Sequence, residues 1–178
     1  MAGRSGEGAP GARSMVALRL LVQGAVLIGA AGIVGHYAGL VMMSSTIGPT
    51  AYLMLAHPDH VTARVRNAVL GHATAIACGL ACLAAFGLWH HPPVTQAGHA
   101  TLGQVAASAL ATGLTLAGLT LLGRHHAPAA ATALLITTGI ARPGRPLYGL
   151  VAGLVIVIVL APLLARLPGA RSRTAELG

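Results

Sequence analysis

Long apolar runs with few charges constrain this chain more than any other feature of its sequence. Four runs, at about 16–40, 67–89, 101–122 and 147–167, reach the roughly 20 residues that a helix needs to cross a bilayer. Only 8% of all residues are charged, whereas a soluble domain carries about 25%. A soluble globule with so few charges could not cover its surface, so the sequence predicts an all-α integral membrane protein.

The basic residues are eleven arginines that lie near the ends of the apolar runs. Such placement is typical of the flanks of spanning helices and not of a basic stripe that binds nucleic acid. We therefore expect membrane lipid, and no nucleic acid, as a partner.

The first apolar run is too long for the core of a signal peptide and is predicted to be a retained helix.

The two ends of the chain are predicted to be disordered tails. The N-terminal tail, 1–15, is rich in Gly and Arg, and Met15 is an alternative start of translation. The C-terminal tail, 168–178, follows the last apolar run. Between the tails we expect one transmembrane domain, 16–167.

Two further apolar segments, 40–58 and 125–143, are interrupted by Pro49 and Pro128 near their starts. The helical part of the first is only about 15 Å long at 1.5 Å per residue, so it cannot cross a core of about 30 Å alone. Either these segments enter the membrane and return, which gives four crossings, or each crosses as an extended piece plus a half-helix, which gives six.

The arginines favour six crossings. With six, nine arginines share the inner face and only Arg142 and Arg145 lie outside. With four, the division is six against five. Because positive residues gather on the inner side, the six-segment arrangement with a cytoplasmic N-terminus, in the cytoplasmic membrane of a bacterium, is the better prediction.

A spacing of 79 residues relates the two halves of the chain. It separates Pro49 from Pro128 and Arg66 from Arg145. If this self-similarity is not a chance alignment of a chain rich in Ala, Leu and Gly, 16–89 and 100–167 are repeats. Each repeat would cross the membrane three times, so the two would face opposite ways, an arrangement that points to a transport site at the broken helices.

The two half-helices are candidates for an anion site, because a helix N-terminus presents N–H groups and a positive dipole end. The competing interpretation is a pair of plain proline kinks whose hydroxyls bond back to the helix. A dipole end contributes only about 0.3–1 kcal/mol, whereas stripping water from an anion costs several, so basic side chains would have to help. The predicted anion-binding residues are Gly48, Pro49, Thr50, His126, Pro128 and Thr132, and the predicted supporting residues are Arg66, Asn67, His72, Arg124 and Arg145. For the arginines, anchoring at the membrane interface is the plainer role.

Carboxylates are missing from the predicted spans. Glu7 and Glu176 lie in the tails, and Asp59 lies in a connection. Any coupling to protons would therefore have to run through histidine. The pairs His90-His91 and His125-His126 lack the spacing of a zinc peptidase, so we predict no enzyme, no cofactor and no metal site.

The sequence resembles the HPP family of small integral membrane proteins, named for a His-Pro-Pro motif. The resemblance lies in GPTAYLMLAHPDHVTARVRNAVLGHATA and HHAPAAATALL, with matches at Gly48, Ala51, Leu53, Pro58, Arg66, Asn67, Gly71 and His72, and at His126, Pro128, Ala131, Thr132, Ala133 and Leu134. The family motif corresponds to His126-Ala127-Pro128, with Ala127 where the family has proline, and not to the literal His91-Pro92-Pro93. The resemblance implies a membrane protein described with four spanning helices, some of whose members are linked to nitrite transport.

These observations together predict a transporter or channel for a small monovalent anion, nitrite first, that forms a homo-oligomer. The first alternative is a membrane subunit that transports nothing and uses its Gly-rich helices to pack against a partner protein. The second is a membrane metalloenzyme that uses the histidines.

Overall fold

The computed structural model describes residues 10–167 and is all-helical over that range. Its elements in chain order are α1 (Pro10–Ala38), α2 (Ile47–Ala56), the 3₁₀ turn η1 (Val61–Ala63), α3 (Val65–Ala85), α4 (Val94–Ala97), α5 (Leu102–Leu121), α6 (Ala129–Thr137) and α7 (Arg145–Ala165). Four of these helices, α1, α3, α5 and α7, are long and apolar enough to cross a membrane. The predicted all-α membrane architecture, with four long helices and two short ones at the proline-broken segments, is confirmed.

Two helix ends differ from the prediction. Helix α1 begins at Pro10, so the part of the expected N-terminal tail at 10–15 is helical; proline is accepted at the first helical position because its missing N–H needs no partner there. Helix α3 ends at Ala85, because Gly87 has a φ of 68° and the Leu88 N–H returns to the Leu83 carbonyl at 2.9 Å. The remainder of the N-terminal tail and the C-terminal tail at 168–178 lie outside the described residues.

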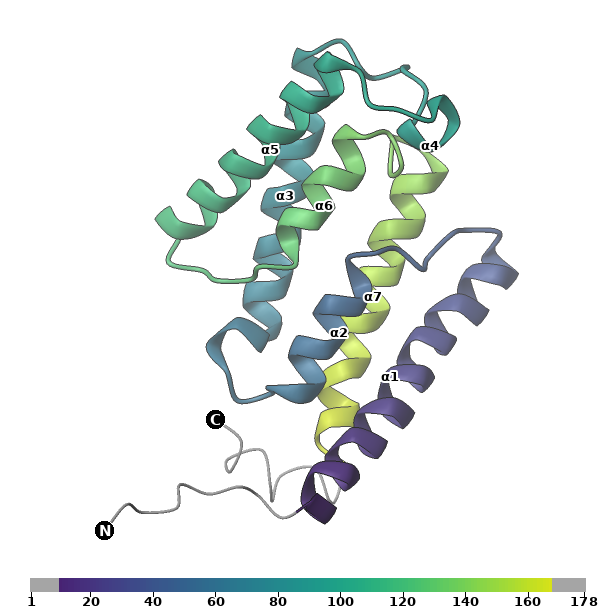
Figure 1. The fold of residues 1–178 in the computed structure, drawn as a ribbon, viewed down its shortest axis with the longest axis vertical. Helices are drawn as coiled ribbons and strands as arrows, with labels where there is room; N and C mark the ends of the chain where they lie inside the picture. The colour runs from purple at the N-terminus through teal and green to yellow at the C-terminus, as the bar shows by residue number, and fades with distance from the viewer. Residues whose placement is uncertain (1–9, 168–178) are drawn as a thin grey trace.

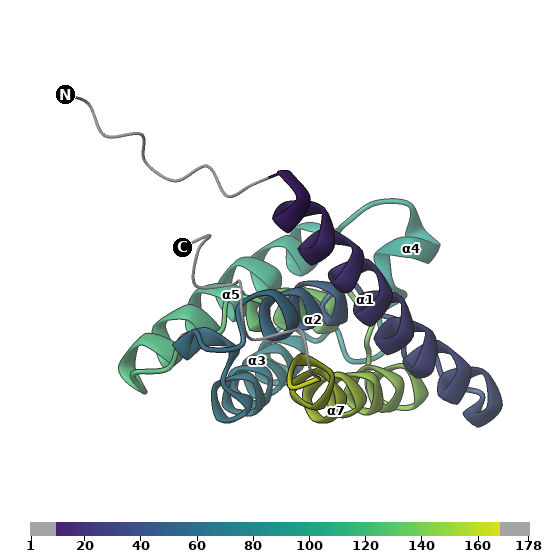
Figure 2. The same cartoon turned by 90° about the horizontal axis from the view of Figure 1, so that it is seen from below.

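The helices form two groups of three. Helix α3 packs mainly against α5 and α6, while α7 packs mainly against α1 and α2, and a smaller contact between α3 and α7 joins the groups. Figures 1 and 2 show both groups. Each short helix thus packs on a long helix from the other half of the chain: α2 lies on α7, and α6 lies on α3.

The short helices begin inside the molecule and run in opposite directions. In Figure 1, α2 and α6 begin at about the same height; α2 then runs towards the lower end, where α1 begins, and α6 runs towards the upper end. Each is preceded by non-helical chain, at 39–46 and 122–128. The long helices alternate, with α1 and α3 running upward and α5 and α7 running downward.

Small residues on α7 let the extended chain before α2 lie directly on this helix. A Cβ added at Gly149 would collide with the carbonyl oxygen of Val41, and one at Gly153 would collide with that of Met42. The backbone of 39–46 therefore occupies the space that side chains would take at these two positions. This close approach positions the start of α2.

Candidate functional site

A cluster of buried polar side chains lies where the two short helices begin. Its members are Thr46, Thr50, His72, His126 and Thr132, which we call the polar cluster; all are between 0% and 3% exposed. They come from the start of α2, from α3, from the connection after α5 and from α6. In a chain that is 55% hydrophobic, buried polar groups of this kind are costly unless they are hydrogen-bonded.

The starts of α2 and α6 are joined by hydrogen bonds. Thr46, the residue that precedes α2, donates from Oγ1 to the carbonyl of Pro128, the residue that precedes α6, at 3.2 Å. The same Oγ1 lies 3.2 Å from Oγ1 of Thr132 in the first turn of α6. Two segments more than 80 residues apart therefore meet end to end inside the molecule.

His72 of α3 is the centre of the polar cluster. Its Nδ1 lies 2.8 Å from Oγ1 of Thr132, and its Nε2 lies 3.2 Å from Oγ1 of Thr50 and 3.2 Å from Nε2 of His126. The two imidazole rings meet edge to face with their centroids 5.0 Å apart. The Nδ1 of His126 lies 3.0 Å from the carbonyl oxygen of Thr62.

The hydrogen-bond partners of His72 and His126 show which ring nitrogens carry protons. The Thr62 carbonyl can only accept, so Nδ1 of His126 carries a proton and, in a neutral ring, its Nε2 accepts. His72 must then donate from Nε2, which leaves its Nδ1 to accept from the Thr132 hydroxyl. Thr50 donates to the Thr46 carbonyl at 2.9 Å and can also accept from His72. Every imidazole nitrogen is satisfied with both rings neutral.

Local sequence explains how these groups come together. Thr46 and Thr50 are one helical turn apart, so their side chains share a face of α2. Gly71, next to His72, lets the connection before α6 approach α3: a Cβ at this position would lie 3.0 Å from Cβ of His126 and 3.2 Å from Cβ of Ala129. The glycine thereby places His126 against His72.

The structure brings four of the predicted residues, Thr50, His72, His126 and Thr132, into the polar cluster, and Pro128 contributes its carbonyl. Gly48 and Pro49 are exposed and lie outside the cluster, and Gly48 lines a pocket on another face of α2. Thr46 is not among the predicted site residues, yet its side chain makes no cap bond and contacts α6. Its spacing from Thr50 is the signal that identifies it.

The predicted supporting residues other than His72 divide into three groups. Asn67 is buried, donates to the Val61 carbonyl at 2.8 Å, and accepts from Arg124 at 3.2 Å. These two side chains therefore tie the connection between α2 and α3 to the connection that holds His126. Arg145 donates to the Gly39 carbonyl at 2.8 Å and joins the start of α7 to the end of α1. Arg66 is exposed at the start of α3. Within 10–167, no hydrogen bond links these arginines to the polar cluster.

The N–H groups at the start of α6 are less available than expected. Those of Ala129, Ala130 and Ala131 bond to the carbonyls three residues earlier, at 3.0–3.2 Å. At α2, the N–H groups of Ile47 and Thr50 also have carbonyl partners. The helix ends therefore act on the polar cluster mainly through their dipoles, and the side chains are the groups that can contact a ligand.

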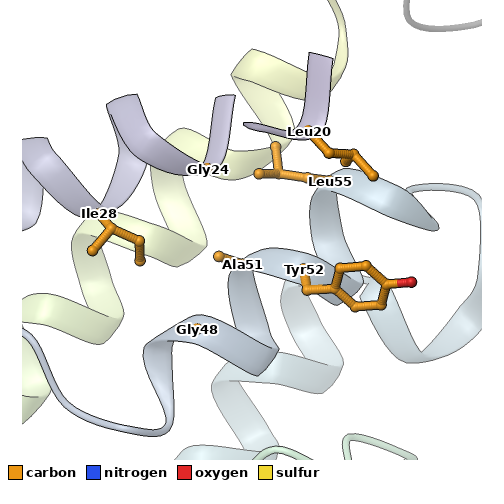
Figure 3. A pocket seen from close by; sticks show the side chains of 7 residues that line it. All are labelled: Leu20, Gly24, Ile28, Gly48, Ala51, Tyr52 and Leu55. Carbon is orange, nitrogen blue, oxygen red and sulfur yellow. The ribbon is translucent and has the colours of Figure 1, made fainter. Parts of the chain in front are cut away.

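A pocket of about 200 Å³ lies on the other face of α2, between this helix and α1. Figure 3 shows its lining, which consists of Leu20, Gly24, Ile28, Gly48, Ala51, Tyr52 and Leu55. None of these residues belongs to the polar cluster. The pocket is apolar.

Acidic and metal-binding groups do not gather at the polar cluster. Asp59 is exposed in the connection after α2. Among residues 10–167, no three side chains of His, Cys, Asp and Glu come together as metal ligands would. The literal His-Pro-Pro sequence at His91 lies in the connection after α3, where His91 is only partly buried, whereas His126 is 1% exposed.

Comparison with known proteins yields one match. The family model described as "HPP, transmembrane region" matches residues 9–174, which is nearly the whole chain. No curated protein and no solved structure matches. The four long apolar helices agree with a membrane domain, and the chain belongs to the HPP family of integral membrane proteins.

Proposed function

We propose that this protein is a transporter or channel for a small monovalent anion, nitrite first, and that the ion binds at the polar cluster. The observation that carries the proposal is the meeting of α2 and α6. Two helices begin next to each other inside a membrane protein, and buried hydroxyls and imidazoles line the point of contact. Helix starts aimed at a buried polar site are the arrangement by which transporters hold anionic groups.

The arrangement of the two halves supports this proposal. We interpret α1–α2–α3 and α5–α6–α7 as inverted repeats, because matching helices of the two halves run in opposite directions in Figure 1. The short helix of each half packs on the third helix of the other half. In such folds the substrate site lies between the repeats, near the middle of the bilayer.

The chemistry of the polar cluster favours a small anion over a cation. No carboxylate of the described residues reaches the cluster, and both adjoining helix starts are positive dipole ends. The three hydroxyls and two imidazoles now bond within the protein. To bind a small oxyanion, some of these donors would turn from their present partners to its oxygens. The side chains of the cluster bond to one another at 2.8–3.2 Å, so only a small ligand would come between them.

Setting and assembly form part of the proposal. We place the protein in the cytoplasmic membrane of a bacterium with its N-terminus inside, as the arginine distribution favours. We propose transport and not catalysis as its activity, and a homo-oligomer as its working form, because so short a chain shields little of its own interior from lipid.

Uptake into liposomes tests the proposal. Purified protein is reconstituted, and entry of nitrite is compared with entry of nitrate and formate. We expect saturable nitrite entry that is lost in Thr132→Val and His126→Ala but kept in His99→Ala, which alters an exposed histidine in the connection before α5. Absence of uptake for all three ions by folded protein would overturn transport, and a second chain that co-purifies with it would support the membrane-subunit alternative.

A further inference from the structure

The two imidazoles of the polar cluster can take up one further proton at a defined atom. Nδ1 of His126 already donates to the Thr62 carbonyl, and one proton lies between the two Nε2 atoms. The remaining nitrogen is Nδ1 of His72, which accepts from the Thr132 hydroxyl at 2.8 Å. A proton added to the pair therefore binds at Nδ1 of His72.

Rotation of hydroxyl groups accommodates this proton without movement of heavier atoms. Once Nδ1 of His72 carries a proton, it donates to Oγ1 of Thr132, whose own hydrogen turns away from the ring. That hydrogen can go to Oγ1 of Thr46 at 3.2 Å, and Thr46 still donates to the Pro128 carbonyl. Proton uptake thus turns the hydroxyl hydrogen of Thr132 away from His72 and towards the start of α2.

A second proton does not fit. It would have to join the first one between the Nε2 atoms of His72 and His126, which are 3.2 Å apart. Two N–H groups would then point at each other across a hydrogen-bond distance, and both rings would be cationic. The capacity of the pair is therefore a single proton.

The surroundings of the pair do not balance this added charge. The elements and connections of the described chain that pack against the pair carry few titratable or charged groups. These are the exposed Tyr52, His57, Asp59, His60, Arg64, Arg66 and His125, the partly buried Arg124 that bonds to Asn67, and Cys78 and Cys82 on α3. Helices α5 and α6 carry no titratable side chain. A buried positive charge without a partner is costly, and the adjoining helix starts oppose it further.

An anion at the polar cluster would supply the missing negative charge. The proton in turn offsets the cost of bringing the anion out of water and provides the Thr132 hydrogen as a donor. Each ligand therefore favours binding of the other, and this coupling is reciprocal. Neither binds well alone.

We infer that the His72–His126 pair carries one proton with each anion, so that the protein is an electroneutral one-proton, one-anion symporter. The inference rests on the proposed anion transport and adds its energy coupling. The proton comes from water on the side of entry, forms an N–H bond at His72, and returns to water with the anion on the other side. No other covalent bond changes.

The stoichiometry of the unmodified protein tests this inference directly. Nitrite uptake into proteoliposomes is measured together with internal pH, and protein-free vesicles set the background, because nitrous acid crosses lipid unaided. We expect one proton per nitrite above background. We also expect the initial rate to stay unchanged when a potassium diffusion potential of about 60 mV is imposed. For an anion that moves alone, the same potential would change the equilibrium ratio of inside to outside concentrations by about tenfold.

The outcomes separate the two levels of the proposal. Nitrite uptake without proton movement, or with a rate that follows the imposed potential, overturns the symport and leaves anion transport standing. No uptake by folded protein overturns both. In His72→Gln, whose amide cannot bind a proton, we expect nitrite uptake to fall and the remaining uptake to carry no proton, while His99→Gln keeps both the rate and the ratio; undiminished uptake at a ratio of one in His72→Gln overturns the role of this pair.

Discussion

At the scale of single residues, the polar cluster is a closed set of hydrogen bonds that holds two neutral histidines inside a largely apolar molecule. Thr132 links His72 to the start of α2, because its hydroxyl lies 2.8 Å from Nδ1 of His72 and 3.2 Å from Oγ1 of Thr46. Removing one member of such a set leaves its partner buried and unsatisfied. The free-energy cost is then larger than the net worth of a single hydrogen bond.

Thr132→Val should therefore destabilise the protein. Valine has a similar shape but leaves Nδ1 of His72 without a donor, and an unsatisfied buried group costs about 1–3 kcal/mol. The midpoint of thermal unfolding in detergent is the measurement. Thr120→Val is the matched control, because Thr120 is exposed and bonds only to the Leu116 carbonyl of its own helix. Equal midpoints for the two variants would contradict the hydrogen-bond assignment.

The two histidines should have opposite tautomers. We expect the proton of neutral His126 on Nδ1, towards the Thr62 carbonyl, and that of neutral His72 on Nε2, towards His126. Nitrogen-15 NMR of histidine-labelled protein at neutral pH distinguishes the two forms. Assignment of the two resonances uses His72→Gln, which removes one of them. Two histidines with the same tautomer would rule out the single shared proton.

The residue types of the site were largely predictable from the sequence, but their orientation was not. The histidines and threonines stand out as polar groups in an apolar chain, so His72, His126, Thr50 and Thr132 were identified. Sequence spacing alone does not say which face of a nine- or ten-residue helix turns inward, and Gly48 and Pro49 were therefore assigned to the site although they lie on the exposed face. Thr46 was missed because its partner, α6, lies more than 80 residues away.

At the scale of elements, the four long helices follow from hydropathy, and the two short ones follow from proline. Hydropathy does not predict the pairing of α2 with α7 and of α6 with α3. The pairing depends on glycines that let a backbone come within contact distance of a helix. Gly149 and Gly153 do this for the chain before α2, and Gly71 does it for the chain before α6.

Gly153→Ala should shift the start of α2. The added methyl group would collide with the Met42 carbonyl, and backbone displacement of this kind costs about 1–3 kcal/mol. We expect a lower midpoint of thermal unfolding and reduced nitrite uptake. Gly113→Ala on α5 is the control, because a Cβ there meets nothing within 4 Å and alanine is about 0.5–1 kcal/mol better than glycine in a helix. Loss of stability in Gly113→Ala but not in Gly153→Ala would contradict this packing.

At the scale of the whole molecule, the decisive property is the number of times the chain crosses the bilayer. If 39–56 and 122–138 each cross as an extended piece plus a short helix, there are six crossings, and the halves α1–α3 and α5–α7 are inverted. If these segments return to the side from which they came, there are four crossings. Only the first arrangement places the starts of α2 and α6 at a point that both sides of the membrane can reach in turn.

Cysteine labelling distinguishes the two topologies. In a background of Cys78→Ala and Cys82→Ala, single cysteines replace His60, His99 or Arg166, all of which are exposed. With six crossings, positions 60 and 166 face the same side and 99 faces the other. With four crossings, 99 and 166 share a side and 60 is opposite. Position 166 serves as the internal reference, because an even number of crossings places it on the same side as the N-terminus in both topologies.

We expect the six-crossing pattern when intact cells are treated with a membrane-impermeant maleimide. The cysteine at 99 should be labelled from outside, and those at 60 and 166 should be labelled only after the membrane is opened, since the arginines gather with 60 and 166. Labelling of 60 from outside while 166 is protected would establish four crossings. The polar cluster would then lie between two loops that open to a single face, and an ion that reached it could leave only by the way it came.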